Sequence, residues 1–391
     1  MKWSNGGILI LLVSVASIAV AETPTQSITV DCNKGQSLNN TLATLNKQVP
    51  NTVLVSGTCT EYVQVVGFEN LTLQGLAGAT LLQPATRTNN QLGLLFIGAS
   101  RSVTLDGLSI QADTATVSTI AIGHGSNDIR LRHLNLQGGT SGITIFEQSQ
   151  VSIAYVTAQD PGFAALGVYD LSDVHVERSL FQSTTGTSYQ VGLFVGASHI
   201  TMYGTNIENM QVGIEAYAGS IIDVLVFTGY YSTGGPTAVV ISNSGGTNYN
   251  GVTIDEGGSL NVSGTKLLIN KPGQTYGGTS GGVLISDGSS MTTSNGDLVI
   301  TGSNGQGVMA VNNAHATLSG ATITGGSHGG LVATNLSSID LSAGTILTLV
   351  GGNSVDLFCD PGSTITGSVN LSSVPTAQCA NLLAGETVAL P

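Results

Sequence analysis

The chain has 391 residues, of which 41% are hydrophobic and only 8% are charged, and its formal net charge is −13. An acidic chain without a basic run is unsuited to neutralising phosphates, so nucleic acid is excluded as a partner. The hydrophobic content is enough to bury a core, which excludes an intrinsically disordered chain.

Residues 1–21 are predicted to be a signal peptide. Lys2 supplies the positive start, residues 8–20 form the apolar stretch, and the small residues 19–21 form a cleavage site before Glu22. A retained membrane anchor is the alternative, although the apolar stretch is short for a full span. We therefore expect a secreted protein, extracellular or periplasmic, whose mature chain has no membrane span.

Residues 22–52 are expected to cap the N-terminal end of the domain. Residues 37–45 have the pattern of a short amphipathic helix, with Ser37 as its N-cap. A strand-forming run over residues 52–61 follows this helix in the chain. At the other end, residues 371–391 are expected to form a C-terminal cap or tail.

The four cysteines lie near the two ends of the mature chain, at Cys32, Cys59, Cys359 and Cys379. Exported proteins can keep disulfides, and pairing within each end is the simplest of the three connectivities. A metal site is disfavoured because no Cys-x-x-Cys motif or Cys/His cluster accompanies them. We expect one disulfide at each end.

A short sequence pattern returns about every 21–27 residues between Leu94 and Ala333, a period typical of a stacked repeat fold. In each repeat a strand-forming run ends in a small polar turn. The runs with their turns occupy residues 96–100, 121–126, 144–149, 167–172 and 194–198. Second strands are expected to begin at Val103, Ile129, Val151, Val174 and Ile200, and third strands at 108–110, 134–136 and 156–158.

Within each repeat, apolar and mostly polar or small residues alternate with a period of two, which indicates half-buried strands. Three strands leave no room for a helix in a repeat. Successive turns would stack parallel strands, so equivalent side chains lie above one another. The predicted fold is all-β: a single-stranded right-handed parallel β-helix of about 12–13 coils over residues 53–370, with a short N-terminal capping helix.

Six serines occupy the same turn of successive repeats: Ser100, Ser126, Ser149, Ser172, Ser198 and Ser220. Stacked hydroxyls bond one another and neighbouring backbone groups, which favours turns. We assign them a structural role.

His124, Glu147 and Asp170 also occupy equivalent positions, at the end of the first strand on three consecutive coils. Carboxylates one strand spacing apart perturb each other's pKa and raise one of the two, which suits a general acid and base for glycosidic cleavage. With Asp173, Glu147 and Asp170 could instead hold Ca²⁺ through oxygen ligands, although no cofactor is required. The third interpretation is a solvated ridge of polar turn residues.

The outward face of the second strands carries Arg130 and Arg132, and two coils later His175 and Glu177. The small residues on the coil between them would leave a shallow depression. The arginines could bind a uronic carboxylate while His175 or Glu177 moves a proton. The alternative is a set of cross-strand charge pairs on a sheet face.

Three aromatic residues, Phe146, Tyr169 and Tyr217, lie near the same turn in their repeats. They form either a strip on which sugar rings stack or an aromatic ladder that stabilises the sheet surface.

From Val53 to Gly367 the coil period and strand pattern resemble the right-handed β-helix superfamily of pectin and pectate lyases and polygalacturonases. Residues 123–125, Gly-His-Gly, match an element of the polygalacturonases, and the resemblance implies a catalytic role for His124. The other catalytic elements of that family are absent, as are the Arg-x-Pro-x-x-Arg run of pectate lyases and the Gly-x-x-x-Asp-Phe pattern of pectin methylesterases.

These patterns favour an exported β-helix protein, acting as a monomer, that binds or cleaves a polysaccharide or cell-surface glycan along a groove between Arg130 and Tyr217. Crowding of charged and aromatic residues between Asp106 and Asp223 supports this function, as a polysaccharide lyase or glycoside hydrolase. A non-catalytic, adhesin-like or structural protein is the alternative, supported by the low charge and by the abundant small polar residues. A sugar epimerase would begin with the same proton abstraction as a lyase.

Overall fold

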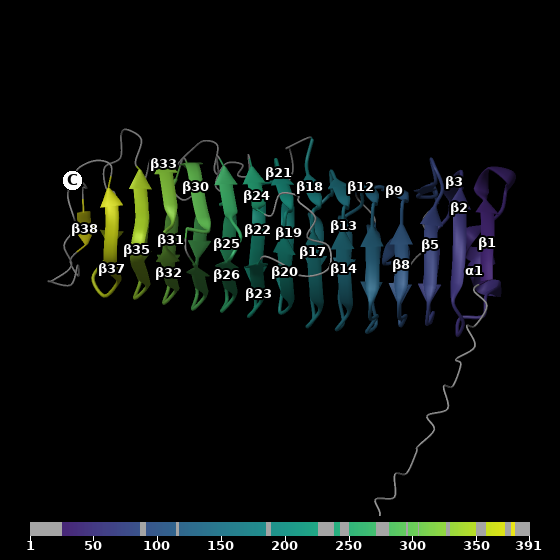
Figure 1. Cartoon of the computed structure of the whole chain (residues 1–391), viewed down its shortest axis with the longest axis horizontal. Coiled ribbons are helices and arrows are strands. Elements are labelled where there is room, and N and C mark those ends of the chain that lie inside the picture. Colours follow the sequence, from purple (N-terminus) through teal and green to yellow (C-terminus); the bar gives the residue numbers. More distant parts are fainter. Residues whose placement is uncertain are drawn as a thin grey trace, which may run out of the picture.

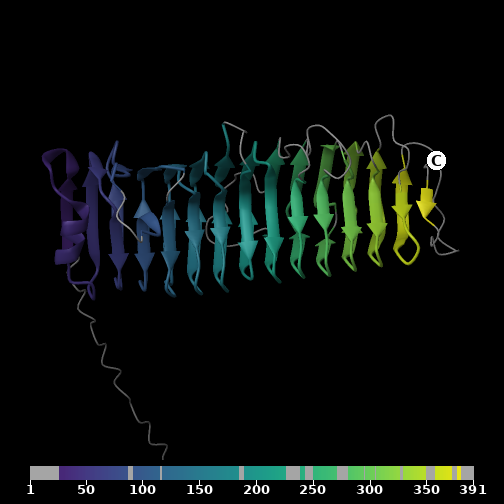
Figure 2. The ribbon, with the colours of Figure 1, turned by 180° about the vertical axis from the view of Figure 1, so that it is seen from behind.

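The computed structural model describes residues 26–86, 91–114, 117–184, 189–225, 238–242, 250–270, 281–294, 296–303, 305–325, 329–348, 357–371 and 377–379. The predicted signal peptide and most of the predicted C-terminal tail lie outside these residues. The described strands stack into a long rod, with the N-terminal elements at one end and the C-terminal strands at the other (Figures 1 and 2).

The rod is built from three columns of strands, and each coil contributes one strand to each column in turn. The first column is a 13-stranded sheet. It contains β4 (Val63–Val66), β7 (Gly93–Gly98), β10 (Ser118–Gly123), β13 (Ser141–Ile145), β16 (Ala164–Val168), β19 (Val191–Gly196), β22 (Val212–Tyr217), β25 (Val252–Ile254), β28 (Val283–Ile285), β31 (Val308–Val311), β34 (Leu331–Thr334), β36 (Leu357–Cys359) and β38 (Ala377–Cys379).

The second and third columns together form a 25-stranded sheet that bends between them. The second column contains β1 (Gln26–Asp31), β2 (Asn51–Ser56), β5 (Leu71–Gly75), β8 (Val103–Asp106), β11 (Ile129–Arg132), β14 (Gln150–Ala154), β17 (Asp173–Glu177), β20 (His199–Tyr203), β23 (Ile221–Leu225), β26 (Ser259–Ser263), β29 (Ser290–Thr293), β32 (His315–Ser319), β35 (Ser338–Thr348) and β37 (Thr364–Leu371). The third contains β3 (Thr58–Thr60), β6 (Thr80–Leu82), β9 (Ser109–Ala112), β12 (Asn135–Gly138), β15 (Thr157–Gln159), β18 (Leu180–Gln182), β21 (Asn206–Glu208), β24 (Val239–Ser242), β27 (Leu267–Asn270), β30 (Leu298–Ser303), β33 (Thr322–Gly325) and the end of β35.

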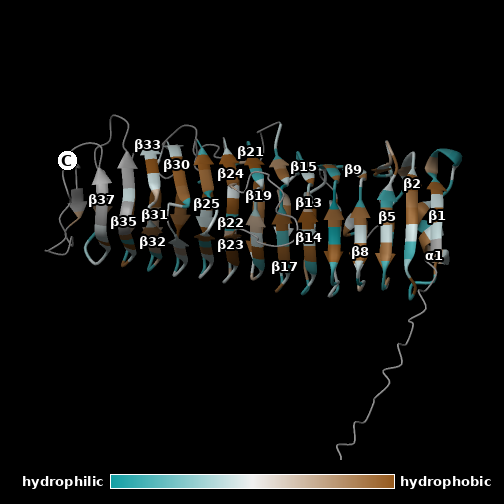
Figure 3. Ribbon diagram, in the orientation of Figure 1, coloured by the Kyte–Doolittle hydropathy of each residue, from teal (hydrophilic) through white to brown (hydrophobic). Residues whose placement is uncertain are grey.

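Strands pair in parallel with matched register, which confirms the predicted β-helix. Ile122 pairs with Ile145, and Ile145 with Val168, and all three side chains are fully buried on one inner wall. The predicted second-strand starts Ile129, Val151 and Val174 are likewise neighbours. The alternating burial follows from the two-residue period of a strand, and hydrophobic residues occupy the strands between polar turns (Figure 3).

The third strands begin one residue later than predicted. Leu108, Leu134 and Val156 precede β9, β12 and β15 and are buried. The residue before each of them has a positive φ, so the backbone turns a corner there: Gly107, His133 and Tyr155. The apolar residue is therefore used to fill the corner before the strand begins.

The N-terminal end is covered by a 3₁₀ turn, η1 (Cys32–Lys34), and by the predicted helix, α1 (Leu38–Thr44), which lies at the purple end of Figure 1. Leu38 and Leu42 are buried against the core. The Ser37 hydroxyl accepts a hydrogen bond from the Asn40 amide at 3.1 Å, as an N-cap does. Glu61 accepts from the Ser37 hydroxyl and the Leu38 amide, both at 2.7 Å, so a carboxylate faces the positive end of the helix.

The cysteines pair as expected, Cys32 with Cys59 and Cys359 with Cys379. In the described part of the chain, no helix is long and apolar enough to cross a membrane.

Candidate functional site

A pocket of about 490 Å³ lies on the outward face of β11, β14 and β17. The register places Arg130, Ser152 and His175 in one row and Arg132, Ala154 and Glu177 in the next. We call this the arginine–histidine pocket; its lining residues are Arg130, Arg132, His133, Ser152, Ala154, Tyr155, His175 and Glu177. The structure thus brings together four of the predicted site residues around a floor of small side chains.

The pocket forms because alternate residues of each strand face opposite sides of the sheet. Ile129 and Leu131 point into the core, so Arg130 and Arg132 must point out. On the next coil Ile153 is buried, and its outward neighbours Ser152 and Ala154 are too short to fill the space. The arginines of β11 are therefore separated from His175 and Glu177 of β17 by two strand spacings, about 10 Å.

His175 and Glu177 occupy unusual environments for titratable groups. Burial lowers the pKa of His175 below its ordinary 6.5, against the opposing effects of Glu177 and Asp173, so the imidazole is uncharged at neutral pH. Glu177 is only 6% exposed. Its Oε1 makes no hydrogen bond and lies 3.8 Å from the Arg178 Nε, which is also unbonded. The two atoms form an ion pair, but neither has the hydrogen bond that would offset the cost of burying it.

Arg130 has a competing partner within its own coil. Its guanidinium lies 2.9 Å from the Asp128 carboxylate, which also accepts from the Ser102 hydroxyl at 2.9 Å. The side chain is nonetheless about half exposed. This ion pair lies within one coil and is not the cross-strand pair of the alternative interpretation, which stays a prediction.

A row of stacked side chains borders the pocket at the corner between the second and third columns. The His133 ring stacks on the Tyr155 ring, with centroids 5.3 Å apart. Its Nδ1 lies 2.9 Å from an Asp106 carboxylate oxygen. Arg178 donates to the Tyr155 hydroxyl at 2.6 Å. Its guanidinium carbon lies 5.8 Å from the centre of the Tyr155 ring and 6.0 Å from that of Tyr203.

Sequence reasoning missed this row. Its members His133, Tyr155 and Arg178 all have positive φ and follow directly after a strand. These three residues are spaced by one coil in the sequence, and this spacing could have indicated that they stack. The alternation of inward and outward residues ends with the strand, however, so it does not predict where a corner side chain points.

His199 forms a second unpredicted cluster beside the pocket. Its Nδ1 lies 3.0 Å from an Asp173 oxygen, and its Nε2 lies 3.0 Å from an Asp223 oxygen. Asp223 also accepts from the Asn261 amide at 2.8 Å. The imidazole ring thus lies between two carboxylates. Asp173 therefore already has an ion-pair partner, His199, on the second column.

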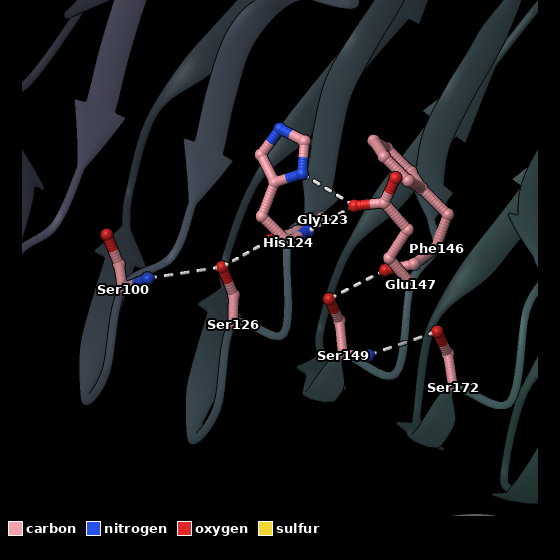
Figure 4. A network of polar contacts seen from close by, with 8 residues as sticks. All are labelled: Ser100, Gly123, His124, Ser126, Phe146, Glu147, Ser149 and Ser172. Carbon is pink, nitrogen blue, oxygen red and sulfur yellow. Dashed lines mark hydrogen bonds and ion pairs between the residues drawn. The ribbon is translucent and has the colours of Figure 1, made fainter.

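The predicted His124–Glu147–Asp170 column exists as a row of turn residues. All three have positive φ, at 56°, 55° and 56°. Glu147 accepts from the His124 amide at 3.0 Å and lies 2.5 Å from its Nδ1, as Figure 4 shows. Glu147 is thus paired with the histidine of the preceding coil, and its catalytic role stays a prediction.

The serine ladder lies directly beneath this column (Figure 4). The Ser126 hydroxyl donates to the Gly123 carbonyl at 2.7 Å and accepts from the Ser100 amide at 3.3 Å. Ser149 and Ser172 repeat the contact at 3.2 Å. The buried hydroxyls hold the turns in place, which is the structural role expected of them.

Calcium binding by Glu147, Asp170 and Asp173 also stays a prediction. Glu147 contacts His124 and Asp173 contacts His199, so two of the three carboxylates have other partners. Among the described residues, the group whose ligand atoms converge for a metal is Cys32, Cys59 and Glu61. Its two sulfurs form a disulfide and are lost as thiolate ligands.

The predicted aromatic residues lie on the first column. Phe146 and Tyr169 follow β13 and β16, and Tyr217 ends β22 opposite Gly196. Phe194 joins them, with ring centroids 5.8 Å from Tyr169 and 5.0 Å from Tyr217. We call Phe146, Tyr169, Phe194 and Tyr217 the aromatic strip. Burial, followed by the charges of Tyr217 and Glu215, raises the pKa of Tyr169.

Glycines of neighbouring coils make room for these rings. A Cβ on Gly123 would lie 2.4 Å from the Phe146 ring, and one on Gly196 would lie 2.5 Å from the Tyr217 hydroxyl. Beside the strip, Glu215 accepts from the Tyr189 hydroxyl at 2.6 Å. Burial raises the pKa of Glu215 despite that hydrogen bond. Glu215 was missed because it is a single charged residue in an apolar strand.

The structure divides the expected single groove between Arg130 and Tyr217. Arg130, Arg132, His175 and Glu177 lie on the second column, whereas Phe146, Tyr169 and Tyr217 lie on the first, which is a separate sheet. The turn that carries His124, Glu147 and Asp170 connects the two. Residues that are close within a coil thus face outward from different sheets.

No family model and no curated protein matches this chain. Solved structures do match. A variant catalytic domain of a GH87 alpha-1,3-glucanase in complex with nigerose has a TM-score of 0.56 at 11% identity, over 90% of this chain and 69% of that chain. PfbA, a surface adhesin of Streptococcus pneumoniae, has 0.42 at 13% identity, over 87% and 93%.

Pectate lyase Pel9A has a TM-score of 0.37 at 13% identity, over 95% of this chain and 82% of that chain. The similarities to PfbA and Pel9A are too weak to support an inference. The comparison with the glucanase domain shows a shared fold. The chain has the parallel β-helix fold that its repeats predicted.

Proposed function

We propose that this protein binds a uronate-containing polysaccharide in the arginine–histidine pocket and cleaves it by β-elimination. The observation that supports this most is the pairing of two guanidinium groups with a half-buried, uncharged imidazole across a floor of Ser152 and Ala154. Guanidinium groups match the geometry of a carboxylate. The pocket is therefore a local basic site on an acidic molecule.

Arg130 and Arg132 bind the uronate carboxylate and stabilise the enolate charge that develops on it. His175 takes the proton from the carbon beside that carboxylate. The electron pair forms a carbon–carbon double bond as the bond to the glycosidic oxygen breaks. The Tyr155 hydroxyl, in the pocket wall, returns a proton to the leaving oxygen. No cofactor is required.

Purified protein incubated with a panel of uronic and neutral polysaccharides tests this function through the ultraviolet absorbance of unsaturated uronate ends. We expect products from a uronate polymer, and a loss of 10²-fold or more in rate for His175→Gln with binding retained. His315→Gln is the matched control, because His315 begins β32 on the same column, far along the rod. Absence of binding to every polymer would reject the proposal.

A non-catalytic glycan-binding surface is the second candidate. The Arg130–Asp128 ion pair favours it, because a guanidinium already held by its own coil contributes less to a transition state. Binding of a uronate polymer without unsaturated ends or epimerised units would support this passive role. Epimerised units without cleavage would indicate that the proton returns to the opposite face of the sugar.

We further propose that the protein acts outside the cytoplasm as a monomer. Two disulfides support export. Light scattering of the active protein should give the mass of a single chain.

A further inference from the structure

Two more pockets adjoin the arginine–histidine pocket and share residues with it. One, of about 380 Å³, lies toward the start of the second-column strands and shares Ser152 and His175. We call it the entry pocket; Asp128, Gln150, Asp173 and His199 also line it. The other, of about 510 Å³, lies around the corner toward the third column and shares Tyr155. We call it the corner pocket; Arg178, Ser179, Gly204 and Asn206 also line it.

The three pockets therefore follow one another in the direction of the strands, across the long axis of the rod. We propose that they hold consecutive units of one saccharide chain, with acidic units in the arginine–histidine and corner pockets and a neutral unit in the entry pocket. This inference rests on the proposed function and specifies its substrate as a polymer with adjacent uronate units. A polymer with alternating acidic and neutral units fits less well.

The charges of the three pockets support this assignment. The corner pocket contains Arg178, held between the rings of Tyr155 and Tyr203 by stacking and by its bond to the Tyr155 hydroxyl. A guanidinium fixed in this way is preorganised to bind a second carboxylate. The entry pocket instead presents Asp128 and Asp173, whose carboxylates disfavour an acidic unit.

The coils on either side of the arginine–histidine pocket disfavour a saccharide that runs along the long axis of the rod. On one side of the arginine–histidine pocket, Arg132 pairs in register with Asp106, a carboxylate that would repel a uronate. On the other side, Glu177 pairs with Tyr203, which is only 4% exposed and closes the row. The strand direction is open, because the floor and the shared residues connect all three pockets.

Calorimetric titration of the protein with defined oligouronides of one, two and three units tests the inference. Alternating uronate–neutral oligosaccharides of the same lengths provide the comparison. We expect affinity to rise about tenfold when a second adjacent uronate is added, the gain typical of one charge-assisted hydrogen bond. Arg178→Gln should abolish that gain, measured as the ratio of the two affinities within the same variant.

Arg101→Gln is the matched control, because Arg101 is exposed between β7 and β8, outside the three pockets. An Arg178→Gln variant that still gains from the second uronate would overturn the inference, as would equal affinities for adjacent and alternating oligosaccharides. In both cases the single uronate still binds, so the proposed function survives. Absence of binding to every uronate ligand would reject both. Circular dichroism of Arg178→Gln checks that the variant is folded.

Discussion

His175 is the residue whose protonation state most directly affects the proposed chemistry. Burial lowers its pKa, so the imidazole stays uncharged to a lower pH than an exposed histidine does. The base is lost only as the pH falls through the folded-state pKa. We predict that the acidic limb of kcat/KM against pH lies below pH 6.5. A limb above that value would assign the proton transfer to another group.

Glu215 gives a prediction about stability. Its folded-state pKa is raised above 4.5 by burial, so its favourable contribution is complete at low pH and is lost as the pH rises through the folded-state pKa. Glu215→Gln removes this dependence. We expect the variant to melt above the wild type at pH 7 and close to it at pH 4. Equal differences at both pH values would contradict a raised pKa.

At this scale the sequence predicts which residues face outward, because strand alternation fixes that for Arg130 and His175. It does not predict partners across coils. The Glu147–His124 contact and the Asp173–His199–Asp223 cluster depend on side-chain rotamers in turns and at strand ends. The pairing of Glu147 with Asp170 was expected from spacing alone, whereas a histidine on the preceding coil provides a partner for Glu147.

The packing of the first column requires glycines, because aromatic rings of neighbouring coils occupy the space where a Cβ would lie. In Gly123→Ala, the new Cβ would lie 2.4 Å from the Phe146 ring, so the ring must move or the coil must shift. We expect a cost of about 1–3 kcal/mol in the free energy of unfolding. Phe146→Leu in the same chain should recover part of that cost, because the obstructing ring is gone. Strictly additive losses, measured by denaturant unfolding, would place the ring elsewhere.

Elements were predictable where a repeated pattern existed. The three strands of each coil follow from runs such as 129–132, 151–154 and 174–177. β14, β17 and β20 begin one residue earlier than predicted, and the third strands begin one residue later. The corner side chains Tyr155 and Arg178 fall outside the alternation, so the pocket wall that they form was not predicted. The prediction of a single groove was wrong for a related reason. Residues that are close in the sequence can lie on different sheets, and the sequence pattern does not show which sheet carries each of them.

For the whole molecule, the N-terminal cap should determine how unfolding begins. Leu38 is fully buried in α1 and covers the first coil. Leu38→Ala leaves a cavity at the end of the stack and should cost about 2–5 kcal/mol. The loss should appear first in the N-terminal coils by hydrogen exchange, because each coil contacts only its neighbours. Asn40→Ala, exposed on the same helix, should change little. Uniform loss of protection along the rod would contradict this.

The dependence of the whole protein on cations is also predictable. If the arginines supply the positive charge for elimination, chelation with EDTA should leave the rate unchanged within twofold, because no step needs a metal. A rate that falls with EDTA and recovers only with Ca²⁺ would favour the ligand set Glu147, Asp170 and Asp173. Glu147→Gln then separates the two outcomes, since it removes one carboxylate from that set.

Matched register between coils has an evolutionary consequence. Val252, Val283 and Val308 are successive neighbours in one column, so the segment between two such positions is an interchangeable unit. Loss of residues 283–307 would place Val308 on Val252 and preserve the inward and outward sense of every later side chain. Duplication of the same segment would lengthen the rod. Deletions and duplications of whole coils can therefore change the length of the protein, while the residues around Ser152 keep their neighbours.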